Sequence, residues 1–134
     1  MYLVDSSVWI DFLRGETTRQ VAALERLLAG DDIVGVAPII LQEVLQGADS
    51  QARLDKWRRY FAHLKCYLPR DPVATHLDAA RLFVNCRRAG KTPRSSNDCL
   101  IARIAIEHAL VLVHDDRDFE AIALVESKLR LFRA

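Results

Sequence analysis

Five acidic residues stand where carboxylates are costly unless they are solvated, paired or bound to a cation. Asp5 directly follows one short apolar segment, and Asp115 and Asp116 closely follow another. Glu43 and Asp98 each lie within or at the head of an apolar stretch typical of a buried helix. Carboxylates that converge at one end of a sheet repel one another, and a divalent cation removes that penalty. An all-oxygen site of this kind favours Mg²⁺ or Mn²⁺ over zinc.

Each acid also has a simpler structural role that the sequence leaves open. Asp5 can cap a helix that begins at the next residue, and Asp98 can belong to a capping box opened by Ser95. Glu43 can be a solvated residue on an amphipathic helix. The acids after the later apolar segment can be turn and cap residues: Asp115, Asp116 and Asp118. These structural roles explain the acids less well as a group than one by one, because all the acids can meet at one end of a sheet.

The remaining composition argues against several other kinds of site. None of the four histidines pairs with a cysteine or another histidine at zinc-ligand spacing, so zinc is not expected. His114 alone adjoins the acids, and a substrate contact, a carboxylate hydrogen bond and a structural role all stay open for it. The sequence has no phosphate-cradling glycine motif and no nucleophile-elbow motif, which leaves nucleotide binding and serine-hydrolase chemistry without support.

The net charge of +1 conceals a strong division along the chain. Residues 1–50 carry a balance of −5, residues 51–103 a balance of +8, and residues 104–134 a balance of −2. The basic middle block is either a set of solvated helix faces or a phosphate-attracting surface beside an acidic one. Four of its cations precede Asp98 closely: Arg87, Arg88, Lys91 and Arg94.

Short apolar segments that alternate with helical patterns must position these residues. We expect strands over residues 2–4, 33–36 and 110–113, and a final one over 129–132. Apolar residues at helical spacing predict helices around residues 21–28, 38–47, 57–64, 73–84 and 99–106. The loop over residues 89–97 is the expected mobile segment.

This alternation predicts an α/β fold: a single domain over residues 1–134, with a mostly parallel central sheet flanked by helices. In such sheets, sites form where the strands end. The longest uncharged apolar run, residues 33–41, is too short to span a bilayer, so no membrane segment is expected. Three widely spaced cysteines and an N-terminus without a signal-peptide pattern favour a cytoplasmic protein.

Four segments resemble, in order and spacing, the motifs of VapC-type PIN domains. VDSSVWI at residues 4–10 resembles the family's opening strand and helix, and ILQEVLQG at 40–47 its glutamate-bearing second motif. SSNDCLIA at 95–102 resembles the third motif, and VLVHDDRDF at 111–119 the fourth. One such motif is weak, because apolar strands often end in aspartate. Four in order cover nearly the whole chain.

The resemblance implies a set of site residues. The matches to the family's catalytic, metal-binding acids are Asp5, Glu43, Asp98 and Asp116. Motif alignment alone favours Asp116 over Asp115. Ser7 matches a hydroxyl that supports the site, and Asp118 is a weaker supporting candidate. Family members often carry threonine or serine where this chain has His114, which puts a hydroxyl-based role there in doubt.

The implied activity is a Mg²⁺-dependent endoribonuclease, with Mn²⁺ as the other suitable cation. Metal-activated water would hydrolyse an RNA phosphodiester bond, and structured RNA such as tRNA is the substrate class that the resemblance suggests. The cations that precede Asp98 could steer the RNA backbone, or could simply be solvent-exposed. A VapB-type antitoxin is the implied partner of such a toxin, in a toxin–antitoxin hetero-oligomer, and the toxin is expected to form a homodimer.

Two other functions stay open. A Mg²⁺-dependent phosphatase or phospho-acceptor domain also places an aspartate after its first strand, but usually has a second aspartate where this chain has Ser7. A non-catalytic binding module would keep the fold without turnover. Two apolar segments are either core or interface: residues 9–13, and the stripe of Trp57, Tyr60, Phe61 and Leu64.

Overall fold

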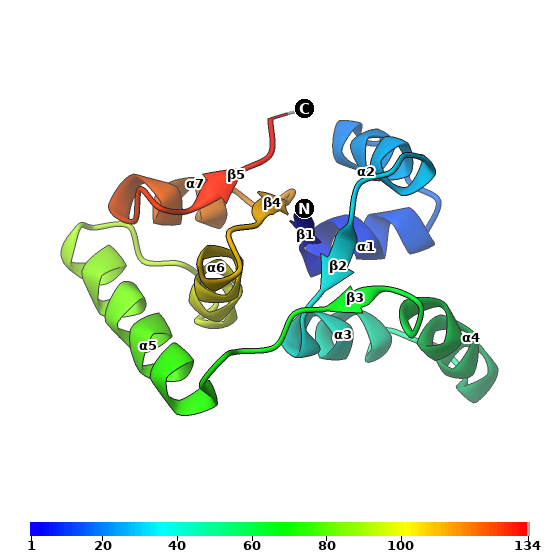
Figure 1. Ribbon diagram of the computed structural model, residues 1–134, viewed down its shortest axis with the longest axis horizontal. Helices are drawn as coiled ribbons and strands as arrows, with labels where there is room; N and C mark the ends of the chain where they lie inside the picture. The colour runs from blue at the N-terminus through cyan, green and yellow to red at the C-terminus, as the bar shows by residue number, and fades with distance from the viewer. Residues whose placement is uncertain (134) are drawn as a thin grey trace.

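The computed structural model describes residues 1–133, which form a parallel sheet between two groups of helices (Figure 1). The strands of this range are β1 (Tyr2–Val4), β2 (Val34–Val36), β3 (Lys65–Cys66), β4 (Val111–Val113) and β5 (Arg130–Leu131). Its helices are α1 (Ser6–Leu13), α2 (Arg19–Ala29), α3 (Pro38–Leu45), α4 (Gln51–Phe61), α5 (Pro72–Arg88), α6 (Asn97–Glu107) and α7 (Arg117–Val125). The predicted α/β class with a parallel sheet is confirmed.

The strand order β3-β2-β1-β4-β5 puts the two strands that lead into aspartates side by side. β1 and β4 pair in parallel, with Tyr2 beside Val111 and Val4 beside Val113. The two strands therefore end level, and the backbone N–H of Asp5 donates to the carbonyl oxygen of Val113 at 2.9 Å. This register brings the acids that follow both strands to one edge of the sheet.

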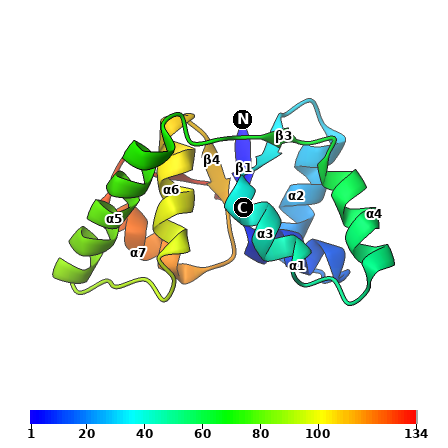
Figure 2. The ribbon, with the colours of Figure 1, turned by 90° about the horizontal axis from the view of Figure 1, so that it is seen from below.

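Helices cover both faces of these short strands, and the strands are apolar for that reason. Figure 2 shows α5, α6 and α7 on one side of the strands, and α1, α2, α3 and α4 on the other. Strands covered on both faces are apolar along their whole length rather than alternating. All three residues of β2 are buried, and Leu3, Val4, Leu112 and Val113 are each at most 1% exposed.

Several parts of the sequence-based prediction differ from the structure. The apolar spacing did not predict α7, and α4 begins earlier than predicted and ends at Phe61, before Leu64. β3 was not expected, because a two-residue strand that contains a lysine has no apolar pattern of its own; it forms by pairing with β2. α5 does contain the expected helix, but its predicted apolar stripe faces outward: Val73 is 71% and Leu77 is 65% exposed. The buried face of α5 carries Thr75, Ala79, Leu82 and Cys86.

Close packing against α6 explains which face of α5 is buried. α6 is the central helix that its sequence predicts, with Cys99, Ile101, Ala102, Ile104 and Ala105 buried. Small side chains on α5 let the two helices approach, and this advantage outweighs the larger apolar area of the other face. None of the helices within residues 1–133 combines the length and hydrophobicity that crossing a membrane requires.

Gly35 in β2 gives a direct test of the packing beneath β3. A Cβ atom on Gly35 would lie 2.3 Å from Cε2 of the buried Tyr67 and 2.9 Å from the Lys65 carbonyl oxygen. We expect Gly35→Ala to lower the free energy of unfolding by about 1–3 kcal/mol, measured by urea denaturation. Gly30→Ala is the control, because its Cβ would make only an ordinary contact of 3.5 Å. Equal stabilities of the two variants would contradict this packing.

Candidate active site

Asp5 is a buried carboxylate that the turn into α1 holds in place. It is 3% exposed and is the N-cap of α1. Its Oδ2 accepts hydrogen bonds from the backbone N–H of Ser7 at 3.1 Å and from Ser7 Oγ at 2.6 Å. Burial raises the pKa of Asp5, and the hydrogen bonds from Ser7 only partly oppose this. The group therefore caps a helix and also places a desolvated carboxylate at the sheet edge.

Ser7 joins the ends of β1 and β4. While its hydroxyl donates to Asp5, the same Oγ accepts the backbone N–H of Asp115 at 3.1 Å. The loop that carries the later acids is thus tied to the first acid through one side chain. The aspartate that phosphatases of the rival class carry at this position is replaced here by a linking hydroxyl.

Glu43 reaches the same region from the middle of α3. Ser6 Oγ donates to Glu43 Oε1 at 3.1 Å, and the Asn97 side chain is near enough to favour the charged form of this carboxylate. Burial raises the pKa of Glu43, and the nearby charge of Asp5 raises it further. Of these neighbours, Ser6 directly follows Asp5 in the chain and Asn97 directly precedes Asp98. Glu43 is therefore not a freely solvated residue on the outer face of a helix.

Asp98 is a second buried acid whose surroundings disfavour its charged form. It lies in the first turn of α6 and is 7% exposed. Burial, followed by the charges of Asp5, Asp116, Asp118 and Glu43, raises its pKa to about 7. The capping-box alternative is wrong, because Ser96 is the N-cap and makes no side-chain cap bond. Ser95 Oγ accepts instead from the backbone N–H of Asn97.

The β4–α7 junction adds two more carboxylates. Asp116 is the N-cap of α7, and its Oδ1 accepts the backbone N–H of Asp118 at 2.9 Å. Within the described residues, Asp98, Asp116 and Asp118 each offer a carboxylate oxygen, and these oxygens lie within 4.8 Å of one another. Asp118, the weaker candidate, thus joins the tight cluster. Asp5 and Glu43 lie near enough for their charges to act on Asp98.

His114 and Asp115, which precede Asp116 in the chain, do not place their side chains in the acid cluster. Asp115 has an exposed side chain and meets the site only through its backbone N–H. His114 is nearly buried: its Nδ1 accepts the backbone N–H of Asp116 at 3.1 Å, and its ring packs against Phe119. His114 therefore shapes the turn that presents Asp116. Its Nε2 lies 3.6 Å from Glu120, away from the acid cluster.

The four candidate RNA-binding cations separate into two groups. Arg87, Arg88 and Lys91 are exposed at the end of α5 and in the loop that follows. Arg94 instead reaches the acid cluster, where its Nη2 donates to Asp116 Oδ1 at 2.8 Å and its Nε to Asp118 Oδ2 at 3.0 Å. Although burial acts to raise the pKa of Asp118, the hydrogen bonds and charge of Arg94 lower it.

Two residues that hold the site were not predicted from the sequence. Ser6 holds Glu43 by a hydrogen bond, Asn97 lies close to the same carboxylate, and each directly adjoins a predicted acid in the chain. A polar residue beside a predicted acid is a weak signal in the sequence. It becomes informative only when its helix is known to contact the helix that carries the other acid. The contact between α3 and α6 brings Asn97 to Glu43.

Comparisons with known proteins identify the family. The PIN domain family matches residues 2–125. VapC ribonuclease Mb1587 of Mycobacterium bovis is 37% identical over 131 residues, which cover 93% of each chain. Ribonuclease VapC32 of Mycobacterium tuberculosis is 31% identical and covers 98% of this chain and 96% of its own.

Solved structures share the fold at lower identity. A VapBC2 structure from Rickettsia felis, bound to a promoter DNA fragment, superposes with a TM-score of 0.74 at 18% identity. The match covers 98% of this chain and 96% of the other. VapBC-1 from nontypeable Haemophilus influenzae gives a TM-score of 0.73, also at 18% identity, with the same coverage of both chains. The family match over nearly the whole length, the relatives at 37% identity and the shared fold establish that this chain belongs to the PIN-domain family, among its VapC members.

Proposed function

We propose that the chain is a divalent-metal-dependent endoribonuclease, the toxin of a VapBC-type toxin–antitoxin module, and that it acts in the cytoplasm. The observation that carries this proposal is the buried acid cluster, in which burial and four neighbouring carboxylates raise the pKa of Asp98 to about 7. A site that is this unfavourable without a cation is expected to bind one. The names of the relatives, VapC ribonucleases, support RNA as the substrate.

The donor set fits a hard divalent cation. Asp98, Asp116 and Asp118 offer oxygen ligands only, and Asp5 and Glu43 add two carboxylates beside them. Oxygen-only sites with several carboxylates favour Mg²⁺ or Mn²⁺. When bound, such an ion lowers the pKa of a coordinated water and offsets the negative charge of a phosphodiester under attack.

The chain's own residues prepare this site. Ser7 and the turn into α1 fix one oxygen of Asp5, and Ser6 holds Glu43, with Asn97 close to the same carboxylate. Within residues 1–133 no hydrogen-bond donor holds the carboxylate of Asp98, which leaves it free to accept a proton or a ligand. Arg87, Arg88, Lys91 and Arg94 are exposed at the end of α5 and in the loop that leads to α6, and they are the proposed source of positive charge for an RNA backbone. Structured RNA such as tRNA is the proposed substrate class.

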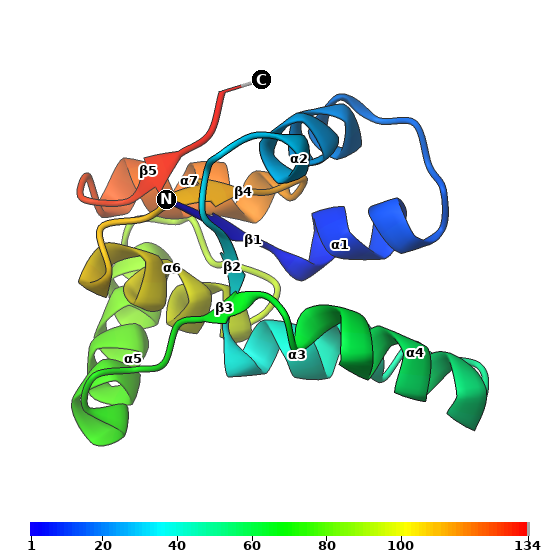
Figure 3. The same cartoon turned by 45° about the vertical axis from the view of Figure 1, so that its right-hand side comes forward.

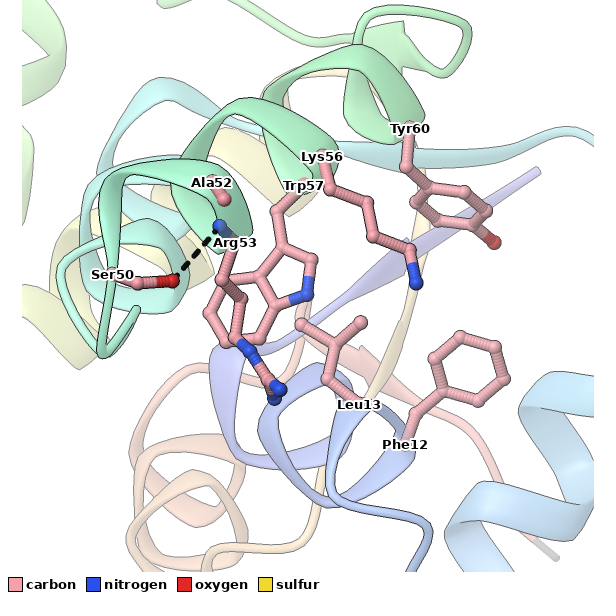
Figure 4. Close-up of a pocket in the computed structure, with 8 residues that line it drawn as sticks. All are labelled: Phe12, Leu13, Ser50, Ala52, Arg53, Lys56, Trp57 and Tyr60. Atoms are coloured by element: carbon pink, nitrogen blue, oxygen red, sulfur yellow. Dashed lines mark hydrogen bonds between the residues drawn. The ribbon is translucent and has the colours of Figure 1, made fainter.

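The antitoxin is proposed to occupy a groove between α1 and α4. Figure 3 shows these two helices as neighbours on the same side of the sheet, and residues of both line a cavity of about 550 Å³. Figure 4 shows Phe12 and Leu13 of α1 facing Trp57 and Tyr60 of α4. Phe61 packs into the core instead, with its ring 5.0 Å from that of Trp9. The aromatic stripe of α4 therefore serves both core and surface.

The charges of the groove indicate the chemistry of its occupant. Arg53 and Lys56 line it beside the aromatic rings, and the Arg53 guanidinium lies 6.0 Å from the centre of the Trp57 ring. A segment with apolar side chains and flanking acids would complement this surface. A VapB-type antitoxin is the proposed source of that segment, consistent with the VapBC complexes that share this fold.

The exposed face of α5 is the proposed homodimer surface. Val73 and Leu77 are solvent-exposed there, and single-chain proteins rarely leave a contiguous apolar face open. A cavity of about 230 Å³ extends this face toward α3 and α6 through His76, Ile39 and Leu100. A second copy of the chain would cover both, because a two-fold interface joins the same face of each copy.

The first prediction from the proposed function concerns cleavage. With Mg²⁺ or Mn²⁺, the purified chain should cut total cellular RNA or tRNA at discrete positions, seen on denaturing gels. EDTA should abolish the cuts, and Asp98→Asn should slow them by about 10²-fold or more, because the charged ligand is lost. The control is Asp71→Asn, which makes the same change at the N-cap of α5, outside the site.

Two results would redirect the proposal. Binding of Mn²⁺ without cleavage of any RNA would favour the non-catalytic binding module. Phosphate transfer from a small phosphodonor to Asp5 would favour the phospho-acceptor alternative. Unchanged cleavage by Asp98→Asn would remove the acid cluster from the mechanism.

The second prediction concerns the pH dependence of stability without metal. The pKa of Asp98 is about 7 in the folded chain, against an ordinary value of 3.8 that it regains on unfolding. Below about pH 4 both states hold the proton. As the pH rises from there to about 7, stability should fall by on the order of 2–4 kcal/mol, because the unfolded state releases the proton first.

Urea unfolding in EDTA, between about pH 4 and pH 8, measures this loss. Asp98→Asn should reduce the slope and should be more stable than the wild type at neutral pH; the slope that remains is expected from Asp5 and Glu43, whose pKa values burial also raises. Asp71→Asn should keep the wild-type slope. A metal-free wild type whose stability does not fall over this range would contradict the raised pKa.

The third prediction concerns the dimer. Leu77→Glu places a charge on the exposed face of α5 and should weaken self-association by about tenfold or more, measured by sedimentation velocity. Ile33→Glu introduces the same charge at a residue that is 50% exposed near the start of β2, and it should leave the dimer intact. A wild type that sediments as a monomer, or a dimer that Leu77→Glu leaves unchanged, would refute this surface.

A further inference from the structure

Arg94 occupies the position that a cation would be expected to take beside Asp116 and Asp118. Its Nη2 donates to Asp116 Oδ1 at 2.8 Å, and its Nε to Asp118 Oδ2 at 3.0 Å. The two acids belong to the cluster whose oxygens lie within 4.8 Å of one another. The guanidinium thus engages one oxygen on each of two candidate metal ligands.

Arg94 contacts the acids through its backbone N–H and, separately, through its guanidinium, and only the guanidinium contact can be displaced without moving the loop. Its backbone N–H also donates to Asp118 Oδ2 at 3.0 Å, so the main chain is tied to α7 independently of the guanidinium. The side chain is 67% exposed. The neighbouring Pro93 is buried and anchors the loop from the other side. The guanidinium can therefore leave the acids while the loop keeps its place.

Charge decides how the guanidinium and a divalent ion affect each other. Without metal, Arg94 supplies the positive charge that two adjacent carboxylates need. With a divalent ion bound at the same carboxylates, the guanidinium and the ion repel each other at short range. The free energy of this repulsion exceeds the small stabilisation that an exposed ion pair provides. Arg94 should therefore oppose metal loading rather than assist it.

We propose that Arg94 is an internal counter-cation that holds Asp116 and Asp118 in the metal-free chain and competes with the divalent ion for them. This inference rests on the metal site proposed above. Displacement of the guanidinium leaves a free positive group at the rim of the site, where the phosphate of an RNA backbone would be its next partner. The contact offsets part of the negative charge of the acid cluster.

The test is the affinity for Mn²⁺ without RNA, measured by titration calorimetry on the full chain. Arg94→Gln should lower the Kd for Mn²⁺ by about three- to tenfold, because a competing charge is removed. Arg94→Lys should stay nearer the wild type. Arg130→Gln is the matched control: Arg130 is exposed beside Val111, at the opposite end of β4 from the acids, and its loss should leave the Kd unchanged. An unchanged or higher Kd for Arg94→Gln would overturn the proposal.

Thermal unfolding in EDTA near pH 8 tests the same contact without metal. Arg94→Gln should lower the Tm by about 2–5 °C relative to the wild type and Arg130→Gln, and saturating Mn²⁺ should remove the difference. An equal Tm in EDTA would overturn the counter-cation role. If the wild type binds no Mn²⁺ at all, the proposed metal site fails, and the EDTA comparison alone decides the role of Arg94.

Discussion

Repulsion among carboxylates at one edge of a parallel sheet is the constraint around which this structure is organised. The paired ends of β1 and β4 bring Asp5 and Asp116 to the same edge, and α6 adds the buried Asp98 between them. Burial makes each charge more costly, because a desolvated carboxylate has little water to screen it from the next one. The rest of the site consists of groups that reduce this cost.

Helix N-termini provide part of the compensation. Asp5 caps α1, Asp116 caps α7, and Asp98 and Asp118 lie in the first turns of α6 and α7. Each N-terminus offers unpaired N–H groups and the positive end of a helix dipole. Three such ends point at one edge of the sheet, so the acids are stabilised locally even though they repel one another. An incoming phosphate would meet the same favourable field.

The sequence was enough to predict the sheet edge and the acids, because both depend on local patterns. An apolar strand that runs into an aspartate is visible in a few residues, as at Val4 and Asp5. The partners of the acids depend instead on which helices meet. Asn97 reaches Glu43 only because α6 contacts α3, and Arg94 reaches Asp116 only because its loop crosses to α7. The outward stripe of α5 has the same cause, since packing against α6 selected the face with small side chains.

Asp5 and Asp116 are helix caps, and this role is compatible with the catalytic role proposed for them. A cap needs one carboxylate oxygen in a fixed direction: Asp5 uses Oδ2 for Ser7, and Asp116 uses Oδ1 for the N–H of Asp118. The other oxygen of each group is then held at a defined place by the same rigid turn. A ligand site requires that kind of preorganisation, because a freely rotating carboxylate loses entropy on binding. The helix caps therefore fix the orientation of the Asp5 and Asp116 carboxylates.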